Sequence, residues 1–138
     1  MQVSELMTEA LVTIKPDDTV RTALLRMEDQ QVRHLPVVEG RRLAGMVSDR
    51  DLREYRLPIM EEIDNPDYAD DLLDTPVSEV MTTDLVTLDT VETIKTAIDL
   101  MLEYGVGAVP VIDRRTDTLA GIVSYVDVLR ALRGTLDE

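Results

Sequence analysis

The chain has 138 residues, a formal net charge of −14, one histidine and no cysteine. Because nucleic-acid binding needs a basic face that neutralises phosphates, this charge argues against a nucleic-acid partner. The lack of cysteine excludes disulfides and thiolate sites and fits a cytoplasmic protein. No apolar run approaches the roughly 20 residues of a membrane span, and no signal-peptide pattern opens the chain, so we expect no membrane association.

The sequence contains a tandem repeat. Residues 3–8 (VSELMT) return as residues 77–82 (VSEVMT), and a constant shift of 74 residues aligns the copies until two residues enter the second copy near Asp117. Copies of about 55 residues would each be marginal alone, because such small domains bury only roughly 60% of their unfolded surface. We therefore expect the two copies to pack face to face around one shared core, with related functional clefts between them.

The first copy shows the pattern of a strand, a helix, two strands and a second helix. Apolar residues at helical spacing follow capping residues, and two short apolar runs flank a glycine turn. The expected elements are a strand at 11–14, a helix at 20–31, strands at 35–38 and 43–47 around a turn at 40–42, and a helix beginning at Ser48.

The second copy repeats this order after an acidic linker. The expected elements are a strand at 85–88, a helix at 92–104, strands at 109–112 and 119–123, and a helix at 124–132. The sequence therefore predicts an α+β fold, with a first domain at 1–56, a linker at 57–76 and a second domain at 77–138, each domain being β-α-β-β-α in a pseudo-twofold pair.

The linker and the first copy differ sharply in charge. Net charges are −1 for residues 1–56, −7 for residues 57–76 and −6 for residues 77–138. Three prolines and the acidic run predict that the linker is mostly loop or short helix, either a simple connector or a regulatory segment. Basic residues gather in the first copy, where they offer partners to an anionic ligand, although four of them are expected by default to be solvated surface charges. These are Arg21, Arg26, Arg41 and Arg42.

The strongest local pattern is glycine, two apolar residues, serine and an aspartate three residues after the serine, at 45–51 and 121–127. Serine followed by an acid resembles a helix capping box, although such boxes favour Glu or Gln over the shorter Asp. A helix start also offers amides to an anion, and an adjacent Asp can accept hydrogen bonds from a sugar diol. Both roles can coexist. Gly45 and Gly121 interrupt strand patterns, which suggests a bulge or the close approach of another group.

The doubled order of these motifs resembles the cystathionine β-synthase (CBS) domain family. The resemblance rests on residues 3–8 and 77–82, on RHLPVV and GAVPVI at 33–38 and 107–112, and on the two Ser-x-x-Asp segments. It implies a stand-alone pair of CBS domains, or Bateman module, which is regulatory and not catalytic. Its expected ligand is AMP, ADP, ATP or S-adenosylmethionine, and its expected partners are a second copy of the chain and an unidentified regulated protein.

The resemblance also implies roles for individual residues. Adenine would be bordered by Thr13, Ile14, Thr87 and Leu88, with Pro36 and Pro110 shaping the base slot. Asp51 and Asp127 would hold ribose hydroxyls, and Ser48 and Ser124 would lie near ribose or phosphate. Gly45, Gly121, Ala108 and Arg50 complete the predicted ligand-binding set.

The two predicted clefts are not equivalent. In relatives, basic residues before the proline meet phosphates of the facing repeat, which points to Arg33 and His34, whereas the second copy has Gly107 and Ala108 there. We therefore expect the Asp127 cleft to gain phosphate contacts. Two alternatives stay open: Arg50 could instead serve the Asp51 cleft, or His34 could be an ordinary partly buried histidine.

Other functions fit the sequence less well. Catalysis is disfavoured because the two aspartates are repeat equivalents with no nucleophile or cofactor motif beside them. One histidine and no cysteine argue against a transition-metal site, although Mg²⁺ could accompany a polyphosphate. A scaffold that binds no ligand and bridges partner proteins is the main alternative. Apolar helix residues could form a dimer surface, but helical periodicity favours burial in the core. These are Leu24, Leu52, Ile98, Leu100 and Val128.

Overall fold

The computed structural model describes residues 1–9, 11–55 and 66–137, which form two compact units. Residues 12–85 form the first-copy unit, and residues 1–11 with 86–138 form the second-copy unit. The units and the sequence repeats therefore have different bounds. The VSELMT-like segment that opens each copy belongs to the unit built on the other copy.

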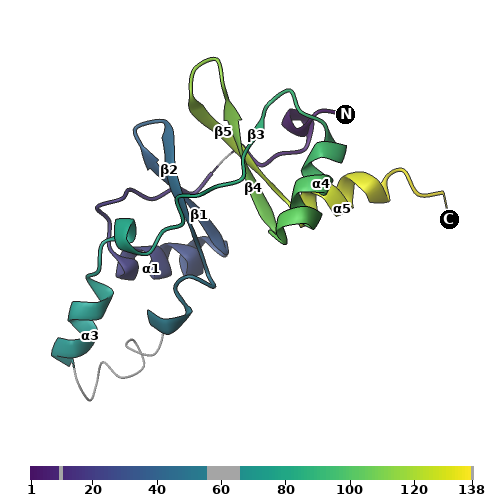
Figure 1. Cartoon of the computed structure of the whole chain (residues 1–138). Coiled ribbons are helices and arrows are strands. Elements are labelled where there is room, and N and C mark those ends of the chain that lie inside the picture. The colour runs from purple at the N-terminus through teal and green to yellow at the C-terminus, as the bar shows by residue number, and fades with distance from the viewer. Residues whose placement is uncertain (10, 56–65, 138) are drawn as a thin grey trace. The chain divides into compact units, whose positions relative to one another are not determined.

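The first-copy unit is a small sheet with helices against it (Figure 1). Its elements are α1 (Val20–Gln30), β1 (His34–Glu39), β2 (Arg42–Ser48) and α3 (Pro66–Leu73), with short 3-10 helices at Arg53–Tyr55 and Val77–Glu79. Strands β1 and β2 pair antiparallel with an irregularity between Val37 and Val38. Ile14 bridges Val37 in parallel, and Thr82 bridges Met46 on the other side of the hairpin.

Helix α1 confirms the prediction from apolar spacing, including its two ends. The main-chain N–H of Thr22 donates to Thr19 Oγ1 at 3.2 Å, which satisfies a free donor at the helix start. Gln31 ends the helix in the left-handed conformation, with φ of 53°. The buried face consists of Val20, Ala23, Leu24 and Met27.

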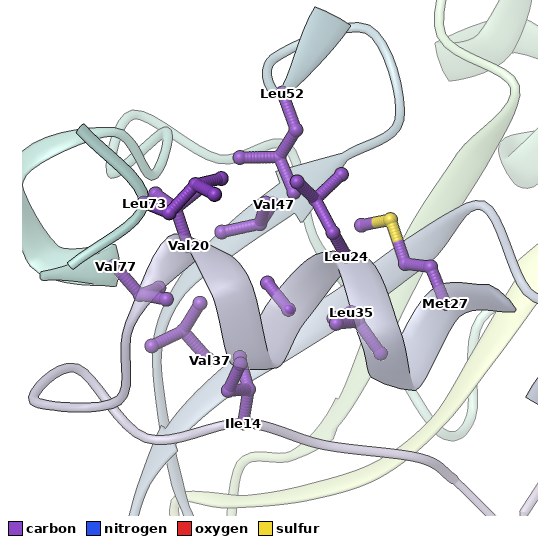
Figure 2. Packing of buried hydrophobic residues seen from close by; sticks show 11 residues of the cluster. Ile14, Val20, Leu24, Met27, Leu35, Val37, Val47, Leu52, Leu73 and Val77 are labelled. Carbon is purple, nitrogen blue, oxygen red and sulfur yellow. The ribbon is translucent and has the colours of Figure 1, made fainter. Parts of the chain in front are cut away.

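The apolar core of this unit gathers residues from every part of it (Figure 2). Leu35, Val37 and Val47 come from the hairpin and Ile14 from the segment beside it. Leu73 lies at the end of the predicted linker, and Val77 belongs by sequence to the second copy; both are fully buried. The end of the linker is therefore part of the core and not only a connector.

The second-copy unit repeats this plan. Its elements are β3 (Leu88–Asp89), α4 (Ile94–Tyr104), β4 (Ala108–Asp113), β5 (Thr118–Ser124) and α5 (Tyr125–Arg133), with a 3-10 helix at Val3–Glu5. The strand order is β3-β4-β5, with β3 parallel and β5 antiparallel to β4. Its core includes Val3 from the start of the chain, together with Leu88, Ala97, Val109, Val111, Val123 and Val128.

Some predicted elements are shorter than expected. The strand at 11–14 is a single bridge at Ile14, and the strand at 85–88 is reduced to β3. A helix was expected to begin at Ser48, but the structure has a turn there, followed by the 3-10 helix Arg53–Tyr55. In this segment the amides bond to the carbonyl three residues back, as in the Tyr55 N–H to Leu52 O bond at 3.0 Å. Residues 56–65 of the first domain and linker lie outside the described residues. Within the described part of the chain, no helix is long and apolar enough to cross a membrane.

Candidate nucleotide site

Gly45 and Gly121 leave room for the Met-Thr segment of the other copy to pack closely against the strand. A Cβ at Gly45 would lie 2.7 Å from Met81 Sδ and 3.0 Å from Thr82 O, and a Cβ at Gly121 would lie 2.7 Å from Met7 Sδ and 2.8 Å from Thr8 O. Each glycine also adjoins the irregularity in its hairpin. The sequence predicted either a bulge or a close approach. Both occur, and the approaching group is the protein's own chain. A contact of these glycines with ligand stays a prediction.

The Ser-x-x-Asp segments form capping boxes in both copies. In the first, Ser48 N–H donates to Asp51 Oδ2 at 2.8 Å and Asp51 N–H donates to Ser48 Oγ at 3.1 Å. In the second, Ser124 N–H donates to Asp127 Oδ2 at 2.9 Å and Asp127 N–H to Ser124 Oγ at 3.2 Å. The shorter Asp therefore closes the box in both copies, although such boxes favour Glu or Gln.

The caps leave one carboxylate oxygen of each aspartate available. Both side chains are half-buried, and no described residue donates a hydrogen bond to Oδ1 of Asp51 or of Asp127. An ionised carboxylate can accept up to about four hydrogen bonds, so the cap does not exhaust it. Each hairpin therefore ends beside a capped aspartate whose Oδ1 can accept further hydrogen bonds. Capping and ligand binding are thus compatible.

Basic residues of the first copy lie at the same end of the hairpin as its cap. His34 pairs with Ser48 across β1 and β2, and the carbonyl of Arg33 accepts from Asp49 N–H at 2.8 Å. Burial lowers the pKa of His34 below its usual value, against an opposing effect of the nearby Asp51 and Asp49 carboxylates. The lowered pKa favours the neutral form of His34, which can donate or accept a hydrogen bond.

The second copy has the same backbone frame with different side chains. Ala108 pairs with Ser124, and Tyr125 N–H donates to Gly107 O at 2.9 Å, as Asp49 does to Arg33. The exposed ring of Tyr125 lies beside Gly107, where a Cβ would approach it to 3.5 Å. Gly107 and Ala108 thus replace Arg33 and His34, and Tyr125 replaces the acidic Asp49.

The segments expected to border adenine run beside the second predicted strand of each copy. Ile14 N–H donates to Pro36 O at 3.0 Å and Ile14 O accepts from Val38 N–H at 2.8 Å. The side chains of Ile14 and Leu88 are in the two cores, and Pro36 and Pro110 are also buried. Half-buried Thr13 and Thr87 are therefore the parts of these segments best placed to meet a ligand.

One residue beside this segment was not identified from the sequence. The guanidinium of Arg26 donates to the Thr13 carbonyl at 2.7 Å and lies 3.9 Å from the Asp18 carboxylate. Arg21 is likewise bonded, to Asp70 of α3 at 2.6 Å. The prediction that these two arginines are simple solvated charges was wrong, because periodicity does not reveal a partner distant in sequence.

The remaining candidate surfaces lie elsewhere. A shallow hollow of about 230 Å³ occurs at the turn end of the first hairpin, lined by Lys15, Pro16, Asp17, Val38, Glu39 and Gly40, and it contains no predicted site residue. The helix residues considered for a dimer surface are instead buried or half-buried against the cores, as periodicity favoured. Across residues 1–9, 11–55 and 66–137, no group of three or more His, Asp or Glu side chains is arranged to hold a metal ion.

Comparison with known proteins identifies the repeats. Residues 3–58 and 77–134 each match the family model described as CBS domain. A CBS domain-containing protein of Dictyostelium discoideum is 34% identical over 137 residues, covering 98% of this chain and 93% of that protein. The crystal structure of CBSX2 in complex with AMP is 27% identical, with a TM-score of 0.79 and 97% of each chain covered. Protein MJ1225 of Methanocaldococcus jannaschii is 27% identical with a TM-score of 0.85, covering all of this chain and 52% of that one.

Proposed function

Because the chain belongs to the CBS domain family, with a tandem pair of CBS domains over nearly its whole length, we propose that it is a regulatory module that binds an adenosine-containing ligand. The ligand is AMP, ADP, ATP or S-adenosylmethionine, and its binding changes how the module acts on a partner protein. The module performs no chemistry itself. A cytoplasmic location is part of this proposal.

One observation carries the proposal: both copies keep the same Ser–Asp cap at the same end of their hairpins, with Oδ1 of the aspartate without a described donor. A cap alone would need only one carboxylate oxygen. The similar CBSX2 structure holds AMP, and ribose offers the adjacent hydroxyl donors that such a carboxylate accepts. We assign ribose to Asp51 and Asp127, and the base to Thr13 and Thr87 with their neighbours.

The phosphate role of Arg33 and His34 belongs to the same proposal. Arg33 is exposed, while His34 is half-buried and its pKa is lowered by burial. Their equivalents Gly107 and Ala108 have no side chain that could donate to phosphate. We therefore propose that one ligand site gains phosphate contacts that the other lacks, with the Asp127 site as the one predicted to gain them.

The direct test is calorimetric titration with AMP, ADP, ATP, S-adenosylmethionine and GMP. It is repeated on Asp51→Ala and Asp127→Ala, each of which should remove one site and leave the other. GMP is the control for base selectivity. The Arg33→Ala/His34→Ala variant should weaken AMP far more than adenosine, because adenosine has no phosphate.

Each result is decisive. Saturable binding that loses one site per aspartate establishes the ligand sites, and equal losses of AMP and adenosine affinity in the double variant remove the phosphate role. Titrations without heat, together with unchanged thermal stability at high ligand concentration, would favour a scaffold that bridges partners, since any ligand of the folded state raises its stability.

We further propose that the chain self-associates through an apolar face on α4 and α5. Leu102 is 79% exposed and Leu129 is 59% exposed, whereas the equivalent first-copy positions are the charged Glu28 and Arg53. Glu103 on α4 and Arg130 and Arg133 in the last turn of α5 give these two helices charges of both signs, which a self-complementary interface between two copies can pair. Light scattering should show a dimer that Leu129→Arg converts to monomers; a monomeric wild type would refute this.

A further inference from the structure

Arg26 connects helix α1 to the segment that leads into the first-copy sheet. Its guanidinium donates to the Thr13 carbonyl at 2.7 Å, and the side chain is about two-thirds covered. Thr13 directly precedes Ile14, whose amide and carbonyl both bond to β1. A charge-assisted hydrogen bond of this kind is roughly twice as strong as a neutral one, so it fixes the carbonyl in one orientation.

The same turn in the second copy lacks this bond. Both turns are closed by a carboxylate, with Lys15 N–H donating to Asp18 at 2.9 Å and Asp89 N–H donating to Glu92 at 3.1 Å. The equivalent of Arg26, however, is Leu100, which packs against the second core and has no donor. The two copies therefore share the turn and differ in what holds the residue before the strand.

We infer that Arg26 is a positioning residue of the first-copy ligand site, which makes that site depend on a guanidinium where the second depends on apolar packing. The inference rests on the proposed function, since Thr13 is assigned to the base by that proposal. Arg26 acts through the Thr13 carbonyl: it sets the direction of the Thr13 side chain and occupies one lone pair of the carbonyl oxygen.

The test uses Arg26→Leu, which gives the first copy the residue of the second, and Arg26→Lys, which keeps the charge. Affinity is measured for AMP and adenosine in an Asp127→Ala background, where only the first-copy site remains, and in an Asp51→Ala background as control. If Arg26 holds the Thr13 segment ready for the ligand, its loss should weaken both ligands in the first background by up to about tenfold, because the free energy of a hydrogen bond to a charged group limits the effect. Arg26→Lys should recover part of the lost affinity. In the Asp51→Ala background, neither variant should change the affinity.

Amide hydrogen exchange separates positioning from ligand binding. Arg26→Leu should speed exchange at Ile14 and Val38, which bond across this segment, but not at Thr8, which bonds to Ile122 in the other unit. Faster exchange with unchanged affinity would overturn the inference and leave Arg26 a purely structural residue. Unchanged exchange and affinity would overturn it as well. If the wild type binds no adenosine ligand, the proposed function itself fails, and the exchange result still reports whether Arg26 holds the segment.

Discussion

Replacement of Leu73 by Ala measures whether the end of the linker belongs to the folded core. Leu73 is 0% exposed and lies in one apolar cluster with Val20 of α1 and Val77 of the following 3-10 helix (Figure 2). The change removes three carbon atoms, worth about 2.4 kcal/mol at roughly 0.8 kcal/mol for each buried methylene. The cavity left behind adds to this, so we expect a total loss of about 3 kcal/mol within the usual 2–5 kcal/mol range.

The assay is urea unfolding followed by circular dichroism. With a slope of about 2 kcal/mol per molar, the midpoint should fall by about 1.5 M at unchanged slope. The control is Leu25→Ala on α1, which makes the same chemical change at a side chain that is 59% exposed and lies outside the proposed dimer face, and we expect it to alter stability by less than about 0.5 kcal/mol. If Leu73→Ala costs no more than this control, α3 does not pack as described, and the linker is a connector after all.

Two further predictions concern the strand glycine and the histidine. Gly121→Ala should cost about 1–3 kcal/mol of stability by overpacking, because its Cβ would lie 2.8 Å from the Thr8 carbonyl oxygen. The control is Gly107→Ala, which should be nearly neutral because the added Cβ has only ordinary contacts. Equal unfolding midpoints for the two variants would contradict the close packing at Gly121. Because the pKa of His34 is lowered in the folded protein, the unfolded chain takes up a proton at higher pH than the folded chain does. The free energy of unfolding should therefore fall as the pH drops below 6.5, the usual pKa of histidine, and should stop falling below the pKa of the folded state. His34→Gln should flatten this part of the curve of unfolding free energy against pH, while an unchanged slope would show that His34 does not contribute.

The sequence predicted the elements whose signals are local. Helix α1 follows from apolar spacing and from a threonine cap, and both hairpins follow from short apolar runs around a turn. The first predicted strand of each copy was overestimated, because Ile14 and Leu88 lie at the edge of short ladders and an apolar run does not reveal how much of it is paired. Helix α3 was only allowed as a short helix, since its burial depends on α1 and on residues far away in the chain.

The candidate site was predictable in composition but not in detail. The repeat located both Ser–Asp caps, and the structure shows that they close despite the shorter Asp. The contact between Arg26 and the Thr13 carbonyl crosses 13 residues and leaves no periodic mark in the sequence. The role of Gly121 was predicted as a close approach, but only the fold shows that the neighbour is the Met-Thr segment of the opposite copy.

The exchange of opening segments explains why the repeat is not the folding unit. Val3 completes the core built on the second copy, and Val77 completes the core built on the first, each with 0% exposure. Thr8 and Thr82 extend the exchange into the sheets by bridging Ile122 and Met46. A fragment cut at the repeat bounds would therefore lose part of its core and leave the sheet edge beside its strand glycine unpaired. The expected single shared core is therefore wrong: each unit has its own core, and each core is completed by a segment of the other copy.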